Sequence, residues 1–122
     1  MTMRRRGLLA VTALVVGARR AAAADPPRLV GSQPVAGGTV PRAPTQVFVR
    51  FDRPVDHIRS RLVVLRGGQP VQVLHPRLEA TPNLLFAMLP ALEPGAYELR
   101  WEVIAIEGSE TVQGTLAFTV QP

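Results

Sequence analysis

The chain contains no cysteine and no lysine among its 122 residues, and it has only two histidines. The absence of cysteine excludes disulfide bonds, thiolate metal ligands and a cysteine nucleophile. A domain of this length must then be stable through its apolar core alone. A chain of roughly 100 residues buries about two-thirds of its unfolded surface, which is sufficient without covalent staples. The scarcity of histidine limits the imidazole ligands that any metal site could use.

The chain after residue 20 carries no excess of positive charge. The formal net charge is +5, but five of the 14 arginines lie within the first 20 residues. The nine arginines that remain are balanced by nine acidic residues, all at or after Asp25. Because a nucleic-acid-binding domain needs a basic surface, we expect no nucleic-acid partner.

The first 24 residues have the pattern of an export signal. Basic residues 4–6 precede an apolar stretch at 7–18 and a run of alanines. The apolar stretch is shorter than the roughly 20 residues that cross a bilayer, so we expect no retained membrane span. We predict a cleavable signal peptide, residues 1–24, with cleavage after either of the last two alanines, and a periplasmic location. The basic start favours the general secretory route, while the pair Arg5-Arg6 leaves the twin-arginine route open.

The most regular pattern lies near the carboxyl end of the chain. Apolar and polar residues alternate along residues 97–103 and again along 115–120. A period of two indicates strands with one buried face. The short polar connection at 107–113 predicts that the two strands pair as an antiparallel hairpin. Trp101 lies in the middle of the first strand, so we expect it in the core.

Shorter strands are expected earlier in the chain. They are an edge-strand candidate at 28–32, a strand at 47–51, a hairpin of 61–65 with 71–74 around Gly67-Gly68, and a strand at 84–89. Residues 34–44 are dense in proline and glycine, so a loop is expected there. About seven short strands without a helical period indicate an all-β fold. We predict an immunoglobulin-like Greek-key β-sandwich that forms one domain, residues 25–122.

Three motifs together resemble a known family. The segment from Leu92 to Val103 reads L-x-P-G-x-Y-x-L-x-W-x-V and is followed by G-x-x-x-F-x-V. Upstream, residues 29–34 read L-V-G-S-Q-P and residues 51–55 read F-D-R-P-V. In this order, over residues 26–120, the motifs are similar to the CopC-type copper-resistance domain, a small periplasmic β-sandwich. The resemblance implies a role in copper homeostasis, a bound copper ion, and a CopD-type membrane copper importer as partner.

The resemblance also identifies where this chain departs from the copper site of the family. The family binds Cu(II) through a histidine at the first residue of the mature chain and a second histidine in a D-x-H loop between the last two strands. Pro26 stands at the first position here. Glu107-Gly108-Ser109-Glu110 replaces the D-x-H loop, with either Ser109 or Glu110 at the histidine position. Cu(II) prefers imidazole nitrogen, which both positions lack. Glu107 keeps a carboxylate at the family's aspartate position, so it is the one metal-ligand candidate that the resemblance supplies.

The two histidines of the chain, His57 and His75, do not match the ligand positions of the family. A histidine near a strand end is more often solvated or hydrogen-bonded than bound to a metal. Glu107 and Glu110, with Asp25 or a free amine nearby, could hold a harder ion, or they could be solvated carboxylates. Copper is therefore expected by resemblance only, since its ligand set is not present in the sequence.

Enzymatic activity is not expected. The serines Ser32, Ser60 and Ser109 have no nucleophile elbow and no recognisable histidine partner. Glu98 and Glu102 could form a carboxylate pair, but both fall on the solvent face of a predicted strand, where solubility explains them.

Three functions remain open from the sequence. We favour an exported CopC-like protein of copper homeostasis or resistance with a degenerate or weak metal site. The alternative is an immunoglobulin-like interaction module that binds no metal, for example beside a CopD-type importer. A third hypothesis is an unrelated exported structural domain, because a fold-level resemblance does not by itself fix function.

Overall fold

The computed structural model describes residues 26–77 and 81–122, which form eight strands. They are β1 (Leu29–Gln33), β2 (Gly38–Val40), β3 (Thr45–Phe51), β4 (Arg61–Arg66), β5 (Gln69–Leu74), β6 (Leu84–Leu89), β7 (Gly95–Ile104) and β8 (Thr111–Val120). The described ranges contain no helix, and so no helix that could span a membrane. The expected signal peptide, residues 1–24, lies outside the described residues.

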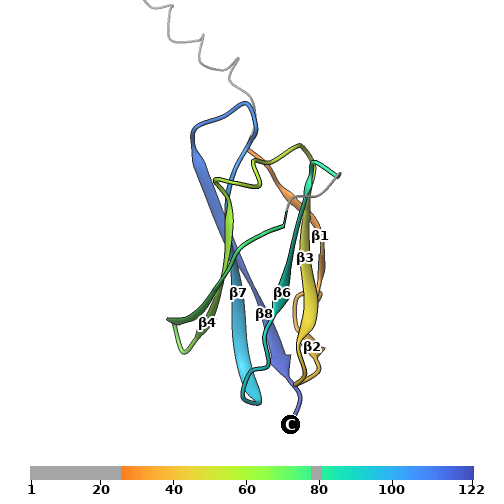
Figure 1. The fold of residues 1–122 in the computed structure, drawn as a ribbon. Helices are drawn as coiled ribbons and strands as arrows, with labels where there is room; N and C mark the ends of the chain where they lie inside the picture. The colour runs from red at the N-terminus through yellow and green to blue at the C-terminus, as the bar shows by residue number, and fades with distance from the viewer. Residues whose placement is uncertain (1–25, 78–80) are drawn as a thin grey trace, which may run out of the picture.

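The strands form two sheets that pack face to face, as Figure 1 shows. One sheet has three strands in the order β1-β3-β6, and the other has five in the order β2-β8-β7-β4-β5. Neighbours such as β3 and β6, or β4 and β7, are far apart in sequence, so the connections cross between the sheets. The expected all-β sandwich is therefore confirmed.

The count of eight strands exceeds the expected seven because β2 lies inside the segment predicted to be a loop. This strand has three residues and pairs in parallel with the end of β8, through Val40 opposite Val120. A strand of three residues in a segment rich in proline and glycine shows no alternation to detect. Its partner lies about 80 residues further along the chain, so no local turn signal marks the pairing.

The core lies between the sheets and follows the alternation in the sequence. Along β3, Val47, Val49 and Phe51 are buried, while the residues between them face outward. Inward residues of β7 and β8 meet them from the other sheet in one continuous cluster. Because this core forms without disulfides, its close packing carries the stability of the fold.

The β7–β8 hairpin has the expected antiparallel register, from Gly95 opposite Val120 to Ile104 opposite Thr111. The strands run further than predicted, which shortens the connecting loop to residues 105–110. Trp101 differs from the expectation, because it is half-buried at the margin of the core rather than inside it. Its indole covers Gly114 on β8, where an added Cβ would collide with the ring.

Candidate functional site

A pocket of about 580 Å³ opens at one end of the sandwich. It is formed by Pro26 and Pro27 before β1, by Arg53 and Pro54 after β3, by Pro82, and by residues 105–110 with Val112 of the β7–β8 connection. Figure 1 shows the lead-in to β1 and the β7–β8 loop together at this end, opposite the C-terminus. Two segments separated by about 80 residues in sequence thus share one cavity.

The lead-in to β1 is held against the end of β3 by Asp52. The Arg28 amide donates to Asp52 Oδ1 at 2.9 Å, and the Asp52 amide donates to the Arg28 carbonyl at 2.9 Å. The Arg28 amide and the adjacent Arg53 guanidinium lower the pKa of Asp52 below its ordinary value. This paired contact, together with the burial of Pro27, places Pro26 at the pocket wall.

The connection between β3 and β4 is folded around Asp56. Its Oδ1 accepts from the amides of Ile58 and Arg59 at 2.9 and 3.0 Å, and its Oδ2 pairs with Arg59 Nε at 2.7 Å. The Arg59 guanidinium, followed by the Arg59 amide, lowers the pKa of Asp56. Arg59 Nη2 donates in turn to the Gly108 carbonyl at 3.0 Å, so this connection also holds the β7–β8 loop.

The start of the β7–β8 loop is fixed mainly through backbone groups. The Ile106 amide donates to the Pro54 carbonyl at 3.3 Å, and the Gly108 amide donates to the Ala105 carbonyl at 2.9 Å. The Ile104 amide donates to Ser60 Oγ at 3.1 Å, and Ser60 is the buried polar residue of this end. Buried backbone donors need such partners, so the loop has a defined shape.

The structure brings the sequence-predicted residues Pro26, Glu107, Ser109 and Glu110 to the same pocket. Glu107, the metal-ligand candidate, is exposed at the pocket, as are Ser109 and Glu110. Among the described residues there is no group of three or more histidines, cysteines or carboxylates that could hold a metal ion. Asp25, the further carboxylate considered above, lies outside those residues.

Neither histidine is among the residues that line the pocket. His57 Nε2 donates to the Leu84 carbonyl at 2.6 Å, which ties the β3–β4 connection to the start of β6. His75 is exposed after β5. The side-chain donors among the described pocket residues are therefore carboxylates and a hydroxyl, and this set fits Cu(II) poorly because Cu(II) favours imidazole nitrogen.

Sequence reasoning did not identify Asp52, Asp56 or Arg59 as residues that shape the site. The spacing of Asp56 and Arg59 is a usable signal, because an aspartate often accepts amides two and three residues later. The bond from Arg59 to Gly108 joins positions 49 residues apart, and no pattern in the sequence indicates it.

These features define a small immunoglobulin-like β-sandwich domain with a pocket between its N-terminal lead-in and its last hairpin loop. The CopC domain family matches residues 29–121. Since the match covers most of the chain, the protein belongs to the CopC domain family.

Solved structures agree with this assignment. The fold is similar to the crystal structure of CopC from Methylosinus trichosporium OB3b, with a TM-score of 0.70 and 30% identity over 79% of this chain and 94% of that chain. An engineered protein matches with a TM-score of 0.65 and 21% identity over 80% of this chain and 20% of that chain, which shows the shared fold alone. A comparison with curated protein sequences found no match.

Proposed function

We propose that this protein is an exported, periplasmic, non-enzymatic protein of copper homeostasis whose Cu(II) site is degenerate. Membership of the CopC domain family supports the copper-related role. One observation supports the degenerate site. The pocket between the lead-in and the last hairpin loop presents Pro26, Glu107, Ser109 and Glu110, while both histidines lie elsewhere.

The chemistry of the pocket supports weak metal binding at most. Glu107 and Glu110 offer oxygen donors, which suit hard ions better than Cu(II). His57 donates to the Leu84 carbonyl through Nε2, which leaves Nδ1 as its possible metal ligand, but His57 is not among the residues that line the pocket.

The proposal includes processing of the amino terminus. Removal of residues 1–24 by a signal peptidase, with the secretory route favoured, leaves a domain of residues 25–122. The anchoring of the lead-in by Asp52 supports a processed end that begins close to the pocket.

The test is a Cu(II) titration of the protein recovered from the periplasm, with its amino terminus read by mass spectrometry. Calorimetry should give an affinity weaker than micromolar, and electron paramagnetic resonance should show no imidazole nitrogen hyperfine structure. Replacing Glu107 by Gln should weaken any residual binding, whereas His75→Ala, the control, should not. A submicromolar site with nitrogen hyperfine structure would contradict the proposal.

A second candidate is an interaction module that binds no metal and acts beside a CopD-type membrane importer. The observation that favours it is the retained shape of the pocket, whose wall is fixed by the Arg59–Gly108 and Ile106–Pro54 bonds although imidazoles are missing. Co-purification with the co-expressed importer, unchanged by copper chelation and lost in Arg59→Ala, would favour this function over the first.

A further inference from the structure

The outward face of the three-stranded sheet carries large apolar side chains where it meets solvent. The register places the outward residues of β3 directly opposite those of β6 in three rows. Together with Arg77, which pairs with Phe86 in an isolated bridge, they form a set that we name the β3–β6 face. Its members are Gln46, Phe48, Arg50, Leu84, Phe86, Met88 and Arg77.

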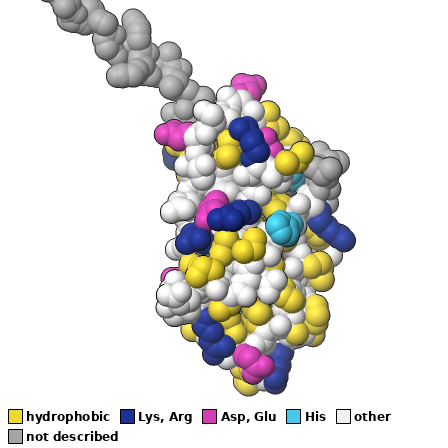
Figure 2. All heavy atoms as spheres, turned by 60° about the vertical axis from the view of Figure 1, so that its left-hand side comes forward, with side chains coloured by type: hydrophobic (Ala, Val, Ile, Leu, Met, Phe, Trp, Pro, Cys, Tyr) yellow, Lys and Arg dark blue, Asp and Glu magenta, His cyan; other side chains and the backbone are white. Residues whose placement is uncertain are grey.

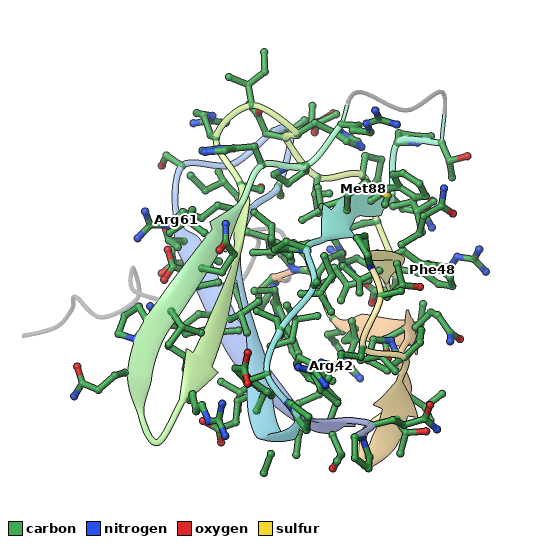
Figure 3. All side chains as sticks on the ribbon, turned by 60° about the horizontal axis from the view of Figure 1, so that its bottom comes forward. Arg42, Phe48, Arg61 and Met88 are labelled. Atoms are coloured by element: carbon green, nitrogen blue, oxygen red, sulfur yellow. The ribbon has the colours of Figure 1, made fainter. Side chains whose placement is uncertain are left out.

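The middle of the β3–β6 face is apolar. Met88 is 43% exposed, and Phe48, Phe86 and Leu84 are half-buried. Cross-strand neighbours in an antiparallel pair lie about 5 Å apart, so Phe48 and Phe86 form one surface. Figure 3 shows Phe48 and Met88 on the same side of the molecule, away from Arg61 on the five-stranded sheet.

The rim of the β3–β6 face is basic and has no acidic partner among the described residues. The Arg50 guanidinium carbon lies 5.9 Å from the centre of the Phe48 ring. The backbone amide of Arg77 donates to the Phe86 carbonyl, and its exposed side chain shares the face of Phe86. The described ion pairs include neither arginine.

The five-stranded sheet also exposes apolar side chains, with Val71 and Val73 of β5 46% and 40% exposed, but the arginines on its outward face are paired. Arg61 and Arg100 both pair with Glu102, at 2.6 and 3.0 Å. Figure 2, which brings the β4 side forward, shows acidic and basic side chains lying next to each other. Charges that neutralise each other within one sheet are typical of a surface that stays solvated.

Aromatic residues, methionine and arginine with few acidic residues are the composition of protein interfaces. We propose that the β3–β6 face is a docking surface for a partner protein segment whose carboxylates flank an apolar side chain. The apolar side chain covers Phe48, Phe86 and Met88, and the carboxylates pair with Arg50 and Arg77. This proposal does not depend on copper, so it can fail while the proposed function holds, or the reverse.

Charge complementarity selects this occupant over two others. A second copy of the chain packed by its own β3–β6 face would bring arginines together without carboxylates, whereas a two-fold interface must be self-complementary. An anionic membrane is typically recognised by clusters of about four to eight basic residues, and Arg50 and Arg77 are fewer. A protein segment satisfies both the apolar centre and the basic rim.

The test follows the side-chain methyl resonance of Met88 in the full chain labelled at methionine. The probe is a synthetic ten-residue peptide in which glutamate alternates with leucine and phenylalanine, and its lysine-for-glutamate counterpart is the matched peptide. The acidic peptide should shift the Met88 resonance saturably, and the lysine peptide should not. Arg50→Glu combined with Arg77→Glu should weaken binding by about tenfold or more, because opposite charges then repel. Arg42→Glu lies outside the face and changes the charge as much as Arg50→Glu alone, and it should leave the affinity within about twofold, whereas Arg50→Glu should weaken it further.

Met88→Ser is a second variant, which removes an apolar side chain of the face without changing its charge. Because this variant lacks the Met88 probe, its binding is followed by labelling the Phe48 ring. Its affinity for the acidic peptide should be lower than that of the unaltered protein. Four results would overturn the proposal. Two concern the peptides: the lysine peptide binds as tightly as the acidic peptide, or the acidic peptide gives no Met88 shift at millimolar concentration. The third is that phosphatidylglycerol vesicles bind more tightly than the acidic peptide. The fourth is a Met88 resonance that moves with protein concentration in the absence of peptide, which indicates self-association.

Discussion

The two ends of the β7–β8 hairpin are held by different chemistry. At the end away from the pocket, the Tyr97 hydroxyl donates to the Glu93 carbonyl at 2.6 Å and accepts from Arg66 Nη1 at 2.8 Å. The Tyr97 ring is buried and stacks on Phe118, with centroids 5.7 Å apart. At the pocket end, the loop itself is held by exposed ion pairs and backbone bonds around Asp56 and Arg59, and the nearest described aromatic pair, Phe51 with Trp101, makes an edge-to-face contact with centroids 6.4 Å apart.

The Tyr97 end of the hairpin therefore contributes mainly to the stability of the domain, and the pocket end mainly to the shape of the pocket. A buried ring contributes through the area that it removes from water and through its packing. Exposed ion pairs contribute little free energy but fix where a loop lies. Perturbing the Tyr97 end should therefore lower the stability of the whole domain, whereas perturbing the pocket end should mainly change the pocket.

The largest effect should come from Tyr97→Ala. Removing the ring leaves a cavity next to Phe118, and the free energy of unfolding should fall by about 3–5 kcal/mol. Tyr97→Phe is the matched control, because it keeps the ring and removes only the hydroxyl bonds, with a loss of about 1 kcal/mol. Urea unfolding followed by Trp101 fluorescence measures both, and equal losses for the two variants would contradict an anchor based on packing.

Ser60→Ala should have an intermediate effect at the pocket end. The variant removes the acceptor of the Ile104 amide, and an unsatisfied backbone donor costs about 1–3 kcal/mol. Ser109→Ala, at an exposed serine of the same pocket, should leave the unfolding free energy unchanged. If both serine variants unfold at the same urea concentration as the unaltered protein, the buried Ser60 bond does not stabilise this end.

Arg59→Ala should change the loop more than the fold. The Gly108 carbonyl loses its guanidinium donor, so amide hydrogen exchange should speed up across residues 105–110 while the melting temperature falls less than in Ser60→Ala. Arg42→Ala, at an exposed arginine away from the pocket, is the control. A fall in melting temperature as large as that of Tyr97→Ala would remove the contrast between the two ends.

The smallest effect on stability should come from acid, which protonates Asp52 and Asp56 at the pocket end. The pKa values of Asp52 and Asp56 are lower in the folded chain than the ordinary aspartate value of about 3.9, so the folded state binds fewer protons there. Their stabilising contribution is complete above that value and is lost as the pH falls through the folded pKa values.

Melting temperatures measured between pH 6 and about pH 2.5 test this prediction. Asp52→Asn combined with Asp56→Asn should flatten the acid branch of the curve, whereas Ser109→Ala, a substitution of an uncharged residue at the same pocket, should leave it unchanged. An unaltered acid branch in the double variant would show that other carboxylates control acid unfolding.

The sequence predicted the elements with long alternation and missed those that depend on distant partners. β3, β7 and β8 show apolar residues at every second position and β6 is a short apolar run closed by Pro90, so these strands could be predicted from the chain alone. β2 could not, because it exists only through β8. The position of Trp101 in its strand predicted a core residue, but the ring is only half-buried. Strand position alone does not specify how much of a large side chain the opposite sheet covers.

The candidate site was predictable in part. Family motifs indicated that Pro26 and residues 107–110 belong to one site, and the structure brings them to one pocket. The residues that hold this pocket in shape could not be predicted, because Asp52 and Arg59 act through backbone groups of distant segments. Every residue carries the same backbone carbonyl and nearly every residue the same amide, so no sequence pattern marks which of them a distant side chain will contact.

β8 lies between β7 and β2, in the interior of the larger sheet. Residues 111–120 therefore pair with strands on both sides in that sheet, although they form its last strand in chain order. While a nascent chain still lacks them, β2 has no partner strand and one edge of β7 is unpaired. The larger sheet can close only when this segment is available, so an incomplete chain leaves strand edges unpaired until then.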